Sequence, residues 1–103
     1  MTSKYSLKIH RKVEKQLQRI PKNKLERVVN ALRSLREDPR PPGCVKLEEQ
    51  LYRVRQGQYR IIYAIFDNEL VVVICKVARR PEDTYKNLQS LLARAENVLG
   101  NKD

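Results

Sequence analysis

The chain has 103 residues and a formal net charge of +10, because 22 Lys and Arg residues outnumber 12 Asp and Glu. Its length fits a single domain over residues 1–103, and no stretch approaches the ~18 consecutive apolar residues of a membrane-spanning helix. With no apolar leader, no Cx2C pair and one His, the sequence predicts a cytoplasmic protein with reduced cysteines and without a metal site or cofactor.

Positive charge is concentrated in the first two thirds of the chain. Residues 1–40 carry 12 basic and 4 acidic side chains, residues 41–80 carry 7 and 4, and residues 81–103 carry 3 and 4. Such a surface attracts polyanions, and nucleic acid is favoured over a membrane because an interfacial helix also needs a bulky apolar face. Simple solubility is the alternative explanation of the same charge.

The first 44 residues are expected to form a strand, two helices and a loop. Residues 5–9 alternate between apolar and polar side chains, which predicts a short half-buried strand. Apolar residues at helical spacing predict one helix that ends at Pro21 and a second that stops before Pro39. The two helices form an αα-hairpin joined by residues 21–23, and the Pro-rich residues 39–44 form a loop.

Three strand candidates follow, and short connections predict an antiparallel meander: Leu51–Arg55, Tyr59–Phe66 and Leu70–Val77. The last strand is a continuous β-branched run, as expected for a strand that is buried on both faces. A helix over about residues 82–99 completes the order β-α-α-β-β-β-α. The predicted fold is α+β: a small, antiparallel-dominated twisted sheet with an N-terminal helical hairpin and a C-terminal helix, the helices packed on one face.

The arginines of the first hairpin are expected to share one sheet face. If Gln56-Gly57 is a two-residue loop, Arg53 lies opposite Arg60, and Arg55 points to the same side. A three-residue loop would shift the register by one and separate them. Because like charges that face each other are destabilising, an anion bound across them is the functional interpretation, and a solvated sheet face is the alternative.

The same reasoning extends this basic face into the next hairpin. With Asp67-Asn68 as its loop, Arg60 lies opposite Cys75, and Arg79 continues the face at the end of the strand. Tyr85, just inside the following helix, is placed near the same end of the sheet and could stack on an unstacked base. The remaining candidates have structural interpretations: a surface or capping position for His10, a small buried apolar group for Cys75, and core positions for Tyr52, Tyr59 and Tyr63.

The segment over residues 52–85 resembles the core signature of the RelE/ParE toxin superfamily: YRVRQGQYRIIYAIFDNELVVVICKVARRPEDTY. The helical hairpin with its Pro-Lys turn also matches, so the resemblance covers roughly residues 5–92. It implies a RelE-like fold and a bacterial type II toxin. Members of the RelE branch are ribosome-dependent mRNA interferases that cut the codon in the A site of the 30S subunit, whereas ParE-like members poison DNA gyrase.

The resemblance also implies site residues. Carried over position by position, the RelE pattern assigns catalytic roles to Arg53, Arg55, Arg60, Arg80 and Tyr85. We also expect Arg53, Arg55, Arg79 and Lys46 to bind RNA. RelE toxins often have lysines where this chain has Arg53 and Arg55. Arginine does not lose its proton in proteins, so the general base is left unassigned.

The expected reaction is metal-independent cleavage of mRNA by its own 2′-hydroxyl, with arginines stabilising the transition state. The implied partners are the ribosome, mRNA and a cognate antitoxin in a hetero-oligomeric toxin–antitoxin complex. The apolar stripe over residues 88–99 suits either exchange with that antitoxin or packing on the sheet. Two alternatives are a ParE-like gyrase inhibitor that is not a nuclease, and a basic RNA-binding module without catalysis.

Overall fold

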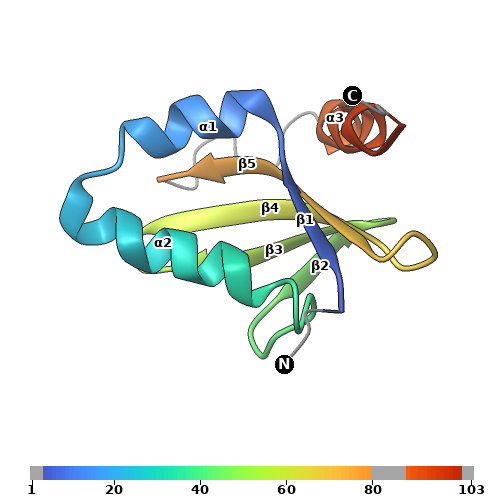
Figure 1. The fold of residues 1–103 in the computed structure, drawn as a ribbon, viewed down its shortest axis with the longest axis horizontal. Helices are drawn as coiled ribbons and strands as arrows, with labels where there is room; N and C mark the ends of the chain where they lie inside the picture. Colours follow the sequence, from blue (N-terminus) through green and yellow to red (C-terminus); the bar gives the residue numbers. More distant parts are fainter. Residues whose placement is uncertain (1–3, 80–87, 101–103) are drawn as a thin grey trace.

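A computed structural model describes residues 4–79 and 88–100, and Figure 1 shows their arrangement. These residues form five strands and three helices in the order β1 (Ser6–Ile9), α1 (Arg11–Gln18), α2 (Lys22–Ser34), β2 (Val45–Glu48), β3 (Leu51–Gln56), β4 (Tyr59–Phe66), β5 (Val71–Ala78) and α3 (Leu88–Gly100). The α+β class is confirmed. The predicted start of the last helix, at residues 82–87, lies outside the described residues. No helix in the described ranges is long and apolar enough to cross a bilayer.

The five strands form one sheet in the order β1-β5-β4-β3-β2. The meander of β3, β4 and β5 is antiparallel, as the sequence predicts, and β1 pairs in parallel with β5. The sequence analysis missed β2, which pairs with β3 at the edge of the sheet. This strand has only four residues, and its register is interrupted between Lys46 and Glu48, so it offers little periodicity to recognise.

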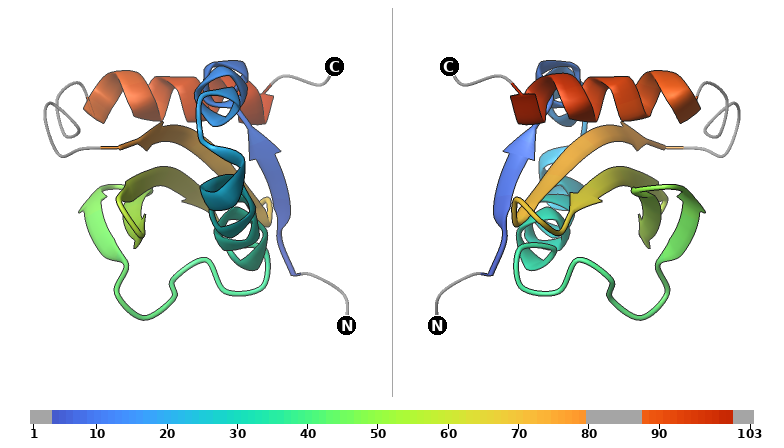
Figure 2. Two further views of the ribbon diagram at one scale, coloured as in Figure 1. Left: turned by 90° about the vertical axis from the view of Figure 1, so that its left-hand side faces the viewer. Right: turned by 90° about the vertical axis from the view of Figure 1, so that its right-hand side faces the viewer.

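The helices cover both faces of the sheet, so the expectation that they pack on one face is wrong. One core cluster joins α1 and α2 to the odd-numbered residues of β4, including Ile61 and Tyr63. A second cluster joins α3, through Leu91 and Ala95, to the even-numbered side, which includes Ile62. Figure 2 shows α3 lying along β5 in two further views. The Leu-rich stripe of α3 therefore packs on the sheet.

Local sequence explains where the first two helices begin and end. The ring Nδ1 of His10 accepts a hydrogen bond from the backbone N–H of Lys12 at 3.1 Å, so His10 is the N-cap of α1, as predicted. Pro21 stands immediately before α2, which ends at Ser34, ahead of Pro39. The hairpin of α1 and α2 is thus fixed at the positions that the sequence indicates.

Candidate functional site

Arg53, Arg55 and Arg60 lie on one face of the sheet, and we call this group the arginine face. Arg55 is directly opposite Arg60, and Arg53 is opposite Ile62. The turn is Gly57-Gln58 rather than Gln56-Gly57, so the predicted pairing of Arg53 with Arg60 is wrong by two residues. A two-residue shift returns every side chain to its original face, and the arginines therefore stay together.

The turn itself explains the shift. Gly57 adopts φ +61, a conformation that glycine reaches without strain, whereas Gln56 remains within β3 as the partner of Tyr59. Glycine at the first position of the turn is the requirement of a type II′ hairpin. The structure therefore places glycine one position earlier in the loop than the sequence analysis assumed.

Burial differs among the arginines. Arg55 is exposed, whereas Arg53 and Arg60 are half-buried. The Nε atom of Arg60 is buried and has no hydrogen-bond partner within the described ranges. No carboxylate of residues 4–79 or 88–100 forms an ion pair with Arg55 or Arg60. A buried donor without a partner destabilises the protein by about 1–3 kcal/mol. An anion placed against Arg60 would remove that penalty.

The second hairpin differs from its prediction. Residues 67–70 connect β4 to β5, Phe66 pairs with Val71, and Arg60 lies opposite Ala78 rather than Cys75. The register also shifts between Ile62 and Tyr63, where β5 contributes an extra residue. Such a bulge is not predictable from the alternation of residues along β4 and β5, because neither strand marks the inserted position.

This register adds Lys76 to the arginine face, and the pairing of β2 with β3 leaves one predicted residue off it. Lys76 is half-buried and opposite Ile62, which is itself opposite Arg53. Sequence reasoning missed Lys76, although its position in the apolar run was a signal. Lys46 pairs with Tyr52 and so belongs to the other face. Arg79 is exposed and lies just past the end of β5, next to Ala78, the residue opposite Arg60. Two further predicted residues, Arg80 and Tyr85, lie outside the described residues.

The sheet face that carries the arginines is divided in two. Its other part consists of buried apolar side chains beneath α3: Leu51, Ile62, Ala64, Phe66, Val71, Val73 and Cys75. Burial raises the pKa of the Cys75 thiol to about 12, so Cys75 is the inert apolar group that the sequence predicts. The basic part therefore adjoins a packed apolar cluster that includes Leu91 and Ala95 of α3.

The opposite face is core, as predicted for its tyrosines. Tyr59 and Tyr63 are buried, and the rings of Tyr52 and Tyr63 stack with centroids 6.1 Å apart. The hydroxyl of Tyr63 donates a 2.6 Å hydrogen bond to the backbone carbonyl of Pro39. Burial, as the largest cause, raises the pKa of Tyr63. Tyr63 thus attaches the Pro-rich loop to β4 and stays protonated at neutral pH.

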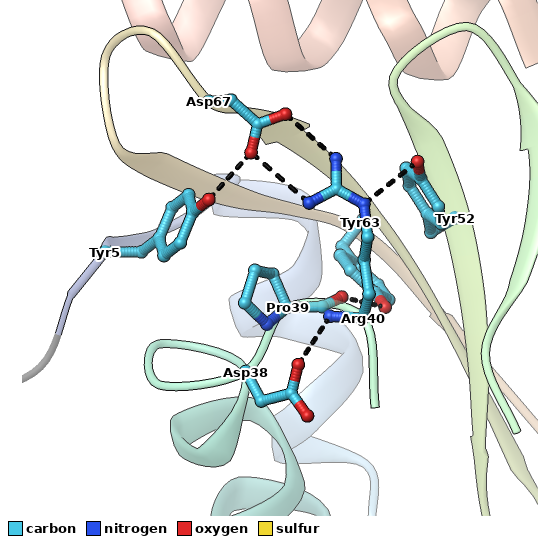
Figure 3. A network of polar contacts seen from close by, with 7 residues as sticks. All are labelled: Tyr5, Asp38, Pro39, Arg40, Tyr52, Tyr63 and Asp67. Carbon is cyan, nitrogen blue, oxygen red and sulfur yellow. Dashed lines mark hydrogen bonds and ion pairs between the residues drawn. The ribbon is translucent and has the colours of Figure 1, made fainter. Parts of the chain in front are cut away.

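A polar network, drawn in Figure 3, surrounds the side chain of Arg40 in the Pro-rich loop. Both guanidinium Nη atoms of Arg40 donate to the carboxylate of Asp67, at 2.9 and 3.3 Å, and its Nε donates to the hydroxyl of Tyr52 at 3.2 Å. The hydroxyl of Tyr5 donates to Asp67 at 2.7 Å. The hydrogen bond from Arg40 is the main cause that lowers the pKa of Asp67. This Arg40–Asp67 network joins Tyr5, which immediately precedes β1, to the Pro-rich loop and the β4–β5 connection.

The described part of the arginine face is suited to electrostatic chemistry. Arginine remains protonated, and its planar fork binds phosphate oxygens through two donors. Burial, as the largest cause, lowers the pKa of His10, which caps α1 and is not on the arginine face. The described ranges contain no group of three or more His, Cys, Asp or Glu side chains arranged to hold a metal ion. What the face offers is fixed positive charge.

Comparison with known proteins identifies the family to which this chain belongs. Residues 7–84 match the family model for the ParE toxin of the type II toxin–antitoxin system parDE. A curated protein of Methanocaldococcus jannaschii that carries the name RelE1 is 30% identical over 89 residues, which cover 82% of this chain and 98% of that protein. The chain therefore belongs to the RelE/ParE superfamily of type II toxins and is RelE-like, as the resemblance of residues 52–85 implied.

Solved structures support the same assignment. A chain of the archaeal RelE–RelB complex from Pyrococcus horikoshii matches with a TM-score of 0.71 at 35% identity, over 77% of this chain and 98% of that chain. A chain of the RelBE2 toxin–antitoxin complex from Mycobacterium tuberculosis matches with a TM-score of 0.66 at 26% identity, over 74% and 98%. The isolated RelE toxin of Escherichia coli, at 18% identity and a TM-score of 0.66 over 87% and 96%, shares the fold.

Proposed function

We propose that the chain is the toxin of a RelBE-type system and acts as a ribosome-dependent endoribonuclease that cleaves mRNA in the A site and inhibits translation. One observation carries the proposal: Arg55 and Arg60 face each other, and the buried Nε of Arg60 has no hydrogen-bond partner among the described residues. Two opposed guanidinium groups destabilise an empty sheet face, and a phosphodiester bound between them offsets their repulsion.

The proposed reaction uses the hydroxyl of the substrate. The 2′-oxygen attacks the adjacent phosphorus, the bond from phosphorus to the 5′-oxygen breaks, and the products carry a 2′,3′-cyclic phosphate and a 5′-hydroxyl. A base takes the 2′-proton and the leaving 5′-oxygen gains one. Arg60 holds the phosphoryl oxygens, while Arg53 and Arg55 position it. From the family pattern, Arg80 supports the leaving oxygen, and Tyr85 orients the nucleotide or takes the proton.

Dependence on the ribosome follows from what the arginine face lacks. Its described residues include no His or carboxylate, and arginine cannot accept a proton in proteins. A site with fixed positive charge alone needs its substrate bent into line, which the ribosome can supply. The net charge of +10 supports docking on ribosomal RNA, and this docking should weaken steeply as salt rises.

An antitoxin is the second proposed partner, in a hetero-oligomer in the cytoplasm. The archaeal and mycobacterial relatives were both solved as toxin–antitoxin complexes. Positive charge on the arginine face and on the exposed sides of α1 and α2 favours an acidic segment in that partner. Binding of such a segment across Arg55 and Arg60 would block the proposed site directly.

A ParE-like gyrase inhibitor is the second candidate, and the match to the ParE toxin family model favours it. Two assays on the purified chain separate the two functions. Primer extension on translating ribosomes should reveal cuts within A-site codons, and DNA gyrase should keep its supercoiling activity. Loss of supercoiling without RNA cuts would instead establish the gyrase inhibitor. If neither activity is found, a basic RNA-binding module without catalysis is the better description.

The chemistry itself has a separate test. A message with a 2′-deoxynucleotide at the cleaved position keeps its phosphate but loses the attacking group. We expect the ribosome programmed with this message to resist cleavage, while a 2′-deoxynucleotide elsewhere in the message has no effect. Cleavage at the modified position would show that water or a protein group is the nucleophile.

A further inference from the structure

A small pocket lies between α2 and the tip of the β3–β4 hairpin, on the face opposite the arginines. Its volume is about 190 Å³, and its side chains come from Lys24, Arg27, Val28, Gln56, Gln58 and Tyr59. This volume is below the roughly 300 Å³ at which sites for drug-sized ligands begin. A phosphate group or a single base is therefore a suitable occupant.

The lining is complementary to a nucleotide. Lys24 and Arg27 supply two positive charges, and no Asp or Glu lines the pocket to balance them. Val28 and Tyr59 are buried and give the pocket an apolar floor. The carboxamides of Gln56 and Gln58 each donate and accept hydrogen bonds, as the edge of a base requires. The two cations suit a phosphate, and the apolar side chains and carboxamides suit a base.

The pocket is adjacent to the arginine face through the hairpin. Gln56 pairs with Tyr59, and the next pair along the strands is Arg55 with Arg60. Successive residues of a strand point to opposite faces, so one pair lines the pocket and the next belongs to the arginine face. Only Gly57 and Gln58 lie between them at the tip, where a Cβ on Gly57 would meet no atom within 4 Å. The tip thus offers an open path between two basic sites.

We propose that this pocket is a second RNA subsite, which holds a nucleotide of the same single strand whose phosphodiester lies on the arginine face. The RNA passes around the tip of the β3–β4 hairpin, and Lys24 and Arg27 bind the phosphate of the nucleotide in the pocket. The inference rests on the proposed function for its choice of RNA as the ligand. The pocket makes binding depend on RNA length, because a fragment confined to the arginine face does not reach α2.

The test compares two lengths of single-stranded RNA with 2′-O-methyl groups, which lack a free attacking hydroxyl. Fluorescence anisotropy measures binding of a 3-nucleotide and a 10-nucleotide RNA to the full chain, to Lys24→Ala/Arg27→Ala, and to Lys22→Ala/Arg33→Ala. The last variant is a matched control, since it removes the same charge from residues of α2 that line a different groove. A further variant, Gln58→Glu, puts a negative charge in the pocket.

We expect the pocket variant to bind the long RNA about tenfold more weakly, with the slope of log affinity against log salt reduced by about 0.7–1.4 for one or two lost phosphate contacts. Its affinity for the short RNA should fall no more than that of the control, and Gln58→Glu should follow the pocket variant. The inference is overturned if the pocket and control variants lose equal affinity, or if both RNA lengths are affected alike.

Failure of this inference and of the proposed function can be told apart. A length-dependent loss in the pocket variant, with no A-site cleavage by the wild-type chain, would retain the RNA subsite and refute the nuclease. Cleavage that requires Arg60, with no difference between pocket and control variants, would retain the nuclease and refute the subsite.

Discussion

Arg55 and Arg60 are paired directly across the β3–β4 hairpin, one residue pair from the turn, and no carboxylate of the described ranges forms an ion pair with either. Like charges in this position oppose folding by roughly 0.2–1 kcal/mol. With a ligand bound between them in the proposed function, the two arginines predict a conflict between stability and activity at these positions.

The first prediction is that Arg55→Ala is at least as stable as the wild type while its RNA cleavage falls. Loss of the repulsion should raise the melting temperature by about 1–8 °C, from a shift of roughly 4–8 °C per kcal/mol for a domain of this size. Thermal unfolding followed by circular dichroism provides the measurement, and Arg33→Ala on α2 is the charge-matched control. A melting temperature well below that of the control would mean that Arg55 has a structural role.

The second prediction concerns the buried hydrogen bond from Tyr63 to the Pro39 carbonyl, 2.6 Å long. Tyr63→Phe leaves that carbonyl without its donor and should lower the free energy of unfolding by about 1–2 kcal/mol. Tyr52→Phe is the comparison, because the Tyr52 hydroxyl only accepts an exposed bond from Arg40. Denaturant unfolding of both variants gives the values, and a larger loss in Tyr52→Phe than in Tyr63→Phe would be inconsistent with the structure.

The third prediction is a pH dependence from the Arg40–Asp67 network. The hydrogen bond from Arg40 lowers the pKa of Asp67 in the folded chain, so its stabilisation is complete above the ordinary Asp pKa of about 3.9. It is lost as the pH falls through the lower folded-state value. The two side chains are 43% and 54% exposed, so the ion pair contributes no more than about 1 kcal/mol.

Asp67→Asn tests this pH dependence. The wild type should melt at a higher temperature than the variant at pH 7, and the difference should shrink below about pH 4. High salt should reduce the difference at pH 7, because the pair is half-exposed. A difference in melting temperature that increases on acidification would contradict the lowered pKa of Asp67.

The fourth prediction separates the two cysteines. Cys75 is fully buried and burial raises its pKa to about 12, whereas Cys44 is half-buried. A thiol-specific reagent at pH 8 should therefore label Cys44 in the native chain, and Cys75 only after unfolding. Cys44→Ser should remove the native reaction. Labelling of Cys75 in native Cys44→Ser at the rate of Cys44 would contradict the packing of α3 on β5.

The sequence predicts which residues share a face better than which residues are paired. Alternation along β3 and β4 puts Arg53, Arg55 and Arg60 on one side, and the error of two in the hairpin register leaves that result unchanged. In the second hairpin, the error in the predicted register does change which residues share a face. The bulge near Cys75 adds a single residue to β5, and a single residue reverses the face of everything beyond it.

Long-range features are the ones that the sequence does not encode locally. The Arg40–Asp67 ion pair joins two loops, and no periodicity relates their positions. The pocket behind the hairpin depends on α2 lying beside residues that come some 30 positions later in the chain. Placement of α3 on the second face likewise follows from tertiary packing, because an apolar stripe alone does not say which side of the sheet it covers.

The most direct measurement of the central claim is the single-turnover rate of A-site cleavage by the wild-type chain, Arg60→Ala and the control Arg33→Ala on the same programmed ribosomes. Removal of one preorganised donor from a charge-stabilising site typically lowers the rate by about 100–1,000-fold. We predict a loss of that size in Arg60→Ala, with its fold intact, and the wild-type rate in Arg33→Ala. Equal rates for the wild type and a folded Arg60→Ala would contradict the account.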